Sequence, residues 1–297
     1  MYLTGFADEA AADIDGQIRA TKKLGWKFIE SRNIGGKNIH DMPEADFEAA
    51  CAKLEAAGVR INCFGSAIAN WGKSILEPFD SSVAEMERAI PRMRRLGVKL
   101  VRIMSFAVIK DRSPDDQMEA ERFRRVGELY RRFTGEGMMP VHENCMNYGG
   151  MGWTYTLRLI DHVPGLKLVY DTGNPVFADD MTRPEPRPKQ SAWEFYERVR
   201  DHVAYIHIKD GVWDAAQGKT RFTYPGEGHG DVRRIVTDLF RRGYDGGISI
   251  EPHLAVVYHD QSVKSEAELR MDTYVEYGQR MERLLEECRR EAAGKSA

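Results

Sequence analysis

The sequence predicts a single barrel of eight parallel strands, each followed by a helix: a (β/α)8 barrel. One arrangement recurs along the 297-residue chain, in which a charged amphipathic segment ends in glycine and a short apolar run follows, as in KKLG-WKFIE, EAAG-VRINCF and RRLG-VKLVRIMSF. Glycine is the usual residue just past the last helical turn, and an apolar run directly after it is typical of a buried parallel strand. The pattern yields eight strand–helix units, the number that closes such a barrel.

Each element follows from its local pattern, and the strands are short apolar runs. They are expected to begin near Leu3, Phe28, Ile61, Leu100, Pro140, Leu168, Ala204 and Ile248. The intervening helices are expected over residues 12–24, 44–57, 82–96, 115–135, 154–163, 191–201, 231–242 and 266–292. Apolar residues recur at helical spacing in the third helix, and Tyr274, Tyr277, Met281 and Leu284 form one stripe in the last. A doubly wound open sheet is the alternative, but GFADEA after the first strand lacks the glycine-rich phosphate loop of that fold.

Domain organisation is expected to be simple. No linker composition interrupts the chain, so residues 1–297 are interpreted as one domain with a short disordered tail after the C-terminal helix. The proline-rich stretch TRPEPRPKQ, residues 182–190, lies between the sixth strand and its helix. It predicts a long loop of the kind that builds active sites at the top of a barrel.

Composition excludes several classes of protein. With 42% hydrophobic and 30% charged residues, the chain matches a soluble globular enzyme rather than a disordered or fibrous one. A net charge of -3 argues against a nucleic-acid partner, which would require a basic surplus. The four cysteines are widely spaced without CxxC, which indicates reduced thiols. No apolar run approaches the ~20 residues of a membrane span, and the N-terminus lacks a signal-peptide pattern, so a cytoplasmic protein without a membrane partner is expected.

Four consecutive predicted strands end in a side chain that can bind a metal. Strands five to eight end in PVHENC, LVYDTGN, YIHIKDG and ISIEPH, which supply Glu143, Asp171, His207 and Glu251. A lone buried histidine is usually a core residue, and a lone aspartate after a strand is often a helix cap. Three carboxylates at one height are costly unless a cation compensates them, so together the four predict a metal site. An oxygen-rich set with one nitrogen favours Mn²⁺, with Mg²⁺, Co²⁺ or Zn²⁺ as alternatives.

The same strand ends resemble the xylose isomerase-like TIM barrel superfamily of sugar phosphate isomerases and epimerases, whose relatives include tagatose 3-epimerase, hydroxypyruvate isomerase, inosose dehydratase and, more distantly, endonuclease IV. The resemblance rests on HEN (142–144), DTGN (171–174), HIKD (207–210), GEG (226–228) and IEP (250–252). It implies that Glu143 and Glu251 are catalytic as well as metal ligands, because the corresponding residues of the family shuttle a proton. The resemblance also implies a homo-oligomer, a dimer or a tetramer.

The expected reaction begins with removal of a proton next to a carbonyl of a small carbohydrate, where a metal stabilises the enediolate and a carboxylate is the base. Return of the proton to the other face gives epimerisation, and return to the neighbouring carbon gives isomerisation. The alternative is a lyase in which the same enolate of a keto-sugar, keto-glycoside or keto-inositol expels a β-substituent. Phosphodiester cleavage, as in endonuclease IV, would require more than the eight histidines present and a basic groove. A non-catalytic barrel is the remaining reading.

Seven further residues are predicted to contact the substrate. Glu30 and Arg32 share one face of the second strand and form either an inward pair or an ion pair at the rim, and Lys73 follows the third strand, where solvent is the alternative. Asn174 stands where many family epimerases have histidine, and no arginine follows His207 as in the tagatose epimerase-like members. Lys209 shares the face of His207, and His253 shares that of Glu251. The resemblance adds Glu227 as an acid lining the site.

Overall fold

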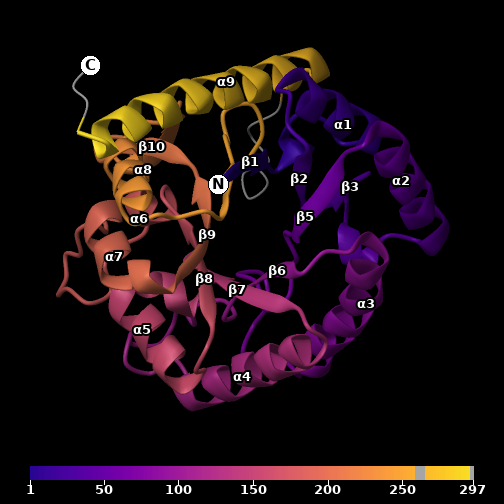
Figure 1. The fold of residues 1–297 in the computed structure, drawn as a ribbon. Coiled ribbons are helices and arrows are strands. Elements are labelled where there is room, and N and C mark those ends of the chain that lie inside the picture. The colour runs from indigo at the N-terminus through magenta and orange to yellow at the C-terminus, as the bar shows by residue number, and fades with distance from the viewer. Residues whose placement is uncertain (258–264, 295–297) are drawn as a thin grey trace.

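In the computed structural model, which describes residues 1–257 and 265–294, eight parallel strands form one sheet that curls into a nearly closed barrel (Figure 1). The strands are β1 (Tyr2–Gly5), β2 (Phe28–Ser31), β5 (Arg60–Phe64), β6 (Leu100–Ile103), β7 (Met139–Glu143), β8 (Lys167–Asp171), β9 (Val203–Ile208) and β12 (Gly247–Ile250). Their order is β1-β12-β9-β8-β7-β6-β5-β2, and a parallel bridge between Phe6 and Glu30 spans the remaining gap. The predicted fold class is therefore confirmed.

Helices surround this barrel in chain order, as Figure 1 shows. They are α1 (Ile14–Lys23), α2 (Glu44–Ala57), α3 (Asp80–Leu96), α4 (Glu119–Gly135), α5 (Trp153–His162), α6 (Asn174–Phe177), α7 (Ala192–Val199), α8 (Val232–Arg241) and α9 (Ala267–Ala292). The predicted glycine stops are present: Gly58 and Gly97 end α2 and α3 with φ of 66° each, a left-handed conformation that glycine adopts without strain. Residues 295–297, the end of the predicted tail, lie outside the described residues.

Two hairpins and several short helices were not predicted. The hairpins are β3 (Asn33–Ile34) with β4 (Lys37–Asn38) and β10 (Asp210–Asp214) with β11 (Lys219–Thr223). The short 3-10 helices are η1 (Ala7–Glu9), η2 (Ile39–Asp41), η3 (Tyr148–Met151) and η4 (Arg200–His202). Like α6, they are too short for a periodic apolar pattern, because each spans only one helical turn. All of these elements belong to the loops rather than to the barrel itself.

The alternation of side chains along β9 divides the core in two. Ile206 and Ile208 are fully buried in the large cluster between barrel and helices. Tyr205 points the other way, into a small cluster with Cys63, Val141 and Val169. This division follows from the two-residue period of a strand and places His207 on the inner face. The cysteines are free thiols, as expected.

Within residues 1–257 and 265–294, no helix combines the length and the apolar character that a transmembrane segment needs.

Candidate active site

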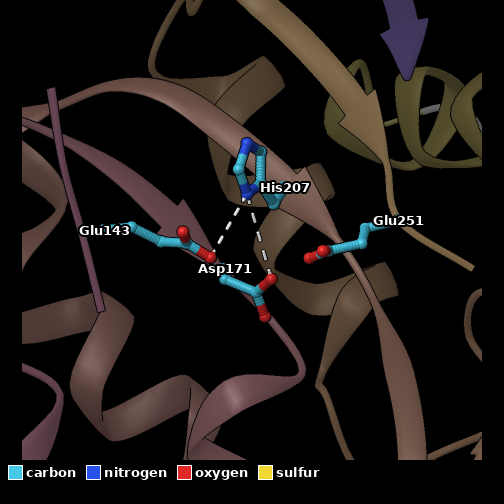
Figure 2. A group of neighbouring side chains, drawn as sticks. All are labelled: Glu143, Asp171, His207 and Glu251. Atoms are coloured by element: carbon cyan, nitrogen blue, oxygen red, sulfur yellow. Dashed lines mark ion pairs between the residues drawn. The ribbon is translucent and has the colours of Figure 1, made fainter. Parts of the chain in front are cut away.

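The carboxyl ends of β7, β8, β9 and β12 bring the four predicted metal ligands together. One ligand atom from each of Glu143, Asp171, His207 and Glu251 lies within 4.8 Å of those of the others, and all four side chains are buried. Figure 2 shows Glu143 and Glu251 reaching toward Asp171 from opposite sides, with His207 above it. Residues that are far apart in the chain thus form one cluster because parallel strands end at the same rim of the barrel.

His207 is held by a residue from the opposite part of the barrel. Its Nε2 lies 3.0 Å and 3.1 Å from the two carboxylate oxygens of Glu30, which is completely buried on β2. A carboxylate accepts hydrogen bonds only, so Nε2 carries the hydrogen in this contact and Nδ1 turns toward Glu143 at 3.5 Å and Asp171 at 4.0 Å. Glu30 therefore selects the tautomer whose free lone pair faces the cluster.

Two arginines hold the two carboxylates that were predicted to be catalytic. Arg32 Nη1 donates to Glu251 Oε1 at 2.7 Å, and Arg102 Nη1 lies 3.1 Å from Glu143 Oε2. Burial raises the pKa of Glu143, but the charges of Arg102 and His207 outweigh it and lower that pKa to about 2. The pKa of Glu251 is likewise well below its usual value, because the neighbouring cations outweigh burial. Both carboxylates are therefore ionised and fixed in place.

Lys209 lies inside the cluster of acids. Its Nζ is 3.0 Å from Asp171 Oδ2 and 2.8 Å from Glu251 Oε2, and its side chain is buried. Burial lowers the pKa of Lys209, but the charges of Asp171 and Glu251 outweigh this effect and raise it. Burial raises the pKa of Asp171 to about 6, helped by the charges of Glu251 and Glu143 and opposed by Lys209. The negative charges of the cluster therefore repel one another enough to favour protonation of Asp171.

Three atoms of the cluster match the requirements of a metal site. Glu143 Oε2, Asp171 Oδ2 and His207 Nδ1 are buried and make no hydrogen bond, although ion pairs lie close to them. Buried polar atoms without a hydrogen bond are uncommon and require an explanation. Together with Glu251 they form an oxygen-rich donor set with one imidazole nitrogen, which fits a divalent cation. The residues present therefore fit the group that the sequence implied.

A cavity of about 900 Å³ opens above the cluster. Glu143 and Glu251 line it, and so do four of the residues predicted to contact substrate: Arg32, Asn174, Lys209 and His253. Asn174 Nδ2 donates to Glu143 Oε1 at 3.3 Å. His253 Nδ1 lies 2.9 Å from Glu9 Oε1, and its Nε2 is 3.9 Å from Glu251 Oε1.

Three predicted substrate contacts are not brought to the cavity. Glu30 lies outside the cavity lining, bound to His207. Lys73 turns away to pair with Glu85 at 2.8 Å and to donate to the carbonyl of Ala67. Both side chains are absent from the cavity lining, because His207 binds Glu30 and Glu85 binds Lys73.

Glu227 is the third, and its motif has a different role from the one predicted. Its exposed carboxylate pairs with Arg280 at 2.7 Å, away from the cavity. The glycines of PGEGHG hold the Asp210 carboxylate, because the amides of Gly226, Gly228 and Gly230 donate to it at 2.8, 3.0 and 2.8 Å. A Cβ at Gly228 would come within 2.3 Å of Asp210 Oδ1, so glycine is required there. These backbone amides form a nest around the Asp210 carboxylate, and this nest anchors the β10–β11 hairpin.

Three charged residues at or next to the cavity were not identified from the sequence. Arg102 is the clearest, since it alternates with the outward Val101 and Ile103 on β6 and so must point inward. Asp8 and Glu9, both of which contact Arg32, follow β1 directly, as catalytic groups do in barrels. The alternation rule would have found Arg102, and the strand-end rule would have found Asp8 and Glu9.

The chain is a (β/α)8 barrel whose candidate active site, a buried cluster that could hold a metal ion, lies at the carboxyl ends of the strands. The chain belongs to the xylose isomerase-like TIM barrel family, whose model matches residues 18–273. No curated protein matches the sequence significantly.

Solved structures share this fold at low sequence identity. A xylose isomerase-like TIM barrel protein from Mycobacterium smegmatis in complex with magnesium has 16% identity and a TM-score of 0.65, over 96% of this chain and 97% of its own. The probable 3-DHS dehydratase from Bacillus anthracis has 15% identity and a TM-score of 0.63, over 92% and 98%. D-allulose 3-epimerase from Methylomonas sp. in complex with D-allulose has 14% identity and a TM-score of 0.64, over 95% and 96%. Proteins that share this fold therefore include an epimerase and a probable dehydratase.

Proposed function

We propose that the protein is a divalent-metal-dependent isomerase or epimerase that acts on a small carbohydrate by removing a proton next to its carbonyl. The observation that carries the proposal is the buried cluster of Glu143, Asp171, His207 and Glu251 at the floor of the cavity. Two of its carboxylates flank the centre from opposite sides, which is the arrangement that removal and return of a proton on two faces requires (Figure 2).

Each protein group has a separate task in this proposal. Glu143 and Glu251 are both ionised, so either can accept the carbon-bound proton and the other can serve the opposite face. Arg102 and Arg32 fix these carboxylates, and Asn174 adds a hydrogen bond to Glu143. Mn²⁺ is the preferred ion, and when bound it would polarise the carbonyl and an adjacent hydroxyl and so stabilise the developing negative charge.

Hydrogen isotope exchange tests this reaction directly. The protein, with Mn²⁺, is incubated with D-allulose, D-fructose and D-tagatose in D₂O. A deuteron in the recovered sugar at the carbon next to the carbonyl, together with epimer or isomer, is the expected result. The Glu143→Gln and Glu251→Gln variants should lose the exchange, whereas Glu227→Gln, whose residue lies outside the cavity, should keep it. Exchange that is equal in wild type and in both cavity variants would refute the assignment.

A lyase is the second candidate, and Lys209 is the observation that favours it. In an elimination the C–H bond breaks, the proton passes to a carboxylate, and the β C–O bond breaks as the departing oxygen takes up another proton. The Lys209 ammonium, 2.8 Å from Glu251 and lining the cavity, is a donor for that oxygen. An unsaturated product released from a keto-sugar, keto-glycoside or keto-inositol, without epimer, would select the lyase.

Metal content tests the common basis of both reactions. Protein from cells grown with manganese should contain a divalent ion, and a Glu143→Gln, Asp171→Asn double variant should contain much less. A wild-type protein without divalent metal would refute both candidates. The cytoplasmic location and the homo-oligomer stay predictions, to be checked by fractionation and by light scattering.

A further inference from the structure

The cavity is larger than one sugar ring needs. Its volume is about 900 Å³. This lies near the top of the range of about 300 to 1,000 Å³ that accommodates whole drug-sized ligands. A single hexose, roughly a dozen non-hydrogen atoms, occupies on the order of 200 Å³ if each atom takes somewhat less than the ~30 Å³ share of a liquid water. If the sugar reacts at the cluster, most of the cavity is left for another part of the ligand.

An aromatic series leads outward from the cluster into this remaining space. His253, whose Nε2 is 3.9 Å from Glu251, contacts the Phe222 ring with centroids 5.1 Å apart. Phe222 in turn contacts Phe177 at 5.1 Å, edge to face. These three side chains all line the cavity and come from the loop after β12, from β11 and from α6. A ligand that extends past His253 therefore contacts the aromatic side chains of Phe222 and Phe177.

Two further apolar side chains in the lining are unusually exposed. Trp71 is 38% exposed and Met146 is 48% exposed, and both border the same cavity. An exposed apolar group that borders a cavity is stabilised when a ligand removes it from water. Their exposure thus points to an apolar occupant of the outer cavity.

The hairpin that carries Phe222 is firmly attached, so its ring is a preformed surface. Asp210, the first residue of β10, accepts backbone hydrogen bonds from Gly211, Gly226, Gly228 and Gly230. The register pairs Gly211 with Phe222, and a Cβ at Gly211 would lie 3.0 Å from Phe177 Cζ. The glycine thus lets the two phenyl rings pack against the hairpin backbone. Binding to a preformed surface requires little ordering of the protein.

From these contacts we infer that the substrate carries a planar apolar group, an aromatic aglycone or substituent, which binds to the wall formed by Phe222, Phe177, Trp71 and Met146 (the aromatic wall). The inference rests on the proposed function for the position of the sugar, at the carboxylate cluster. A second sugar ring suits the wall less well, because Phe222, Phe177 and Met146 offer its hydroxyls no strong hydrogen-bond partner, and burying unpaired hydroxyls is unfavourable.

Binding of three unreactive probes tests the inference. Phenyl β-D-glucopyranoside, methyl β-D-glucopyranoside and cellobiose are titrated into the full-length protein with Mn²⁺ by calorimetry. The phenyl glycoside should bind at least about tenfold more tightly than the methyl glycoside, because its ring removes apolar surface from water. Cellobiose should bind about as weakly as the methyl glycoside.

Variants localise the effect. Phe222→Ala and Phe177→Ala should reduce the phenyl-to-methyl ratio to near one, and the gentler Phe222→Leu should give an intermediate ratio if Phe222→Ala proves unstable. Leu76→Ala is the matched control, because Leu76 is 60% exposed yet lies outside the cavity. The inference would be overturned by a phenyl-to-methyl affinity ratio near one in wild type, or by a ratio that the wall variants leave unchanged. Tighter binding of cellobiose than of the phenyl glycoside, or no binding of the phenyl glycoside, would also overturn it.

The two proposals fail separately. Isotope exchange on free ketoses without a phenyl preference would overturn the aromatic wall as a binding surface and leave the proposed reaction intact. A phenyl preference in a wild-type protein that contains no divalent metal and exchanges no protons would support the wall and refute the reaction.

Discussion

Replacing Glu30 with glutamine should weaken metal binding by about tenfold to a hundredfold while leaving the barrel folded. Glu30 does not line the cavity; its two oxygens lie 3.0 and 3.1 Å from His207 Nε2. A glutamine of the same size keeps one acceptor for that hydrogen but removes the negative charge that makes the imidazole a stronger donor to a cation. The change also allows the amide to bind the ring in the wrong tautomer, with its NH₂ group toward Nε2.

The expected loss corresponds to about 1.4 to 2.7 kcal/mol of binding free energy, the range for a hydrogen-bond partner that orients a ligating histidine. Titration of the metal-free protein with Mn²⁺, followed by calorimetry or by the loss of the free-ion electron paramagnetic signal, measures it.

Glu85→Gln is the matched control. Glu85 is also a partly buried carboxylate with a cationic partner, Lys73 at 2.8 Å, but it does not touch the four candidate ligands. This variant should bind Mn²⁺ as wild type does. A folded Glu30→Gln protein with wild-type Mn²⁺ affinity would refute the role assigned to Glu30. Weakened substrate binding with unchanged Mn²⁺ affinity would instead support its predicted contact with substrate.

Three further predictions concern groups around the site. Burial lowers the pKa of His40 from 6.5 to about 4 despite Asp41 beside it, so the unfolded chain takes up the proton first as pH falls, and stability is lost between these values. Moving from pH 7 to pH 5 should therefore remove about 2 kcal/mol of urea-unfolding free energy through His40 alone, so the total loss should be smaller by about that amount in His40→Gln, whereas a variant of the exposed His229 should lose as much as wild type. Asp210→Asn, which turns an amide toward backbone donors, should lower stability by about 3 kcal/mol and weaken phenyl glycoside binding; a variant that keeps both would contradict the nest. Lys209→Met should destabilise the metal-free protein by about 3 kcal/mol and enlarge the rise in melting temperature on adding Mn²⁺, and an equal rise in both proteins would count against it.

The barrel and the cluster were predictable because they depend on periodic patterns. Every strand begins within one residue of its expected start, since buried apolar runs and helix-stop glycines are local signals. His207 follows in the same way from the alternation along β9, which sends Ile206 outward to the helices. Arg102 obeys the same alternation along β6, but it comes before the last residue of that strand, and the sequence prediction considered strand ends alone.

Contacts across the barrel were beyond sequence reasoning. Glu30 and His207 are 177 positions apart, and their meeting depends on the register and the bulge between β2 and β5 that set the height of Glu30. The GEG motif illustrates a different difficulty, since an acid flanked by glycines suggests a functional acid. The backbone amides bind Asp210 instead, and their direction depends on loop geometry that residue type alone does not specify.

The balance of buried charges at the barrel mouth explains why the cluster favours a bound cation. Within the described residues, six buried carboxylates gather at the barrel mouth with three buried permanent cations: Asp8, Glu9, Glu30, Glu143, Asp171 and Glu251 with Arg32, Arg102 and Lys209. Such an excess of buried negative charge must be met by bound protons or by a cation. In the protein alone, protonation of His207 supplies part of the compensation, which is why its pKa rises to about 10. A divalent ion supplies the same charge at the atoms that make no hydrogen bond, so the electrostatics and the donor geometry lead to the same site.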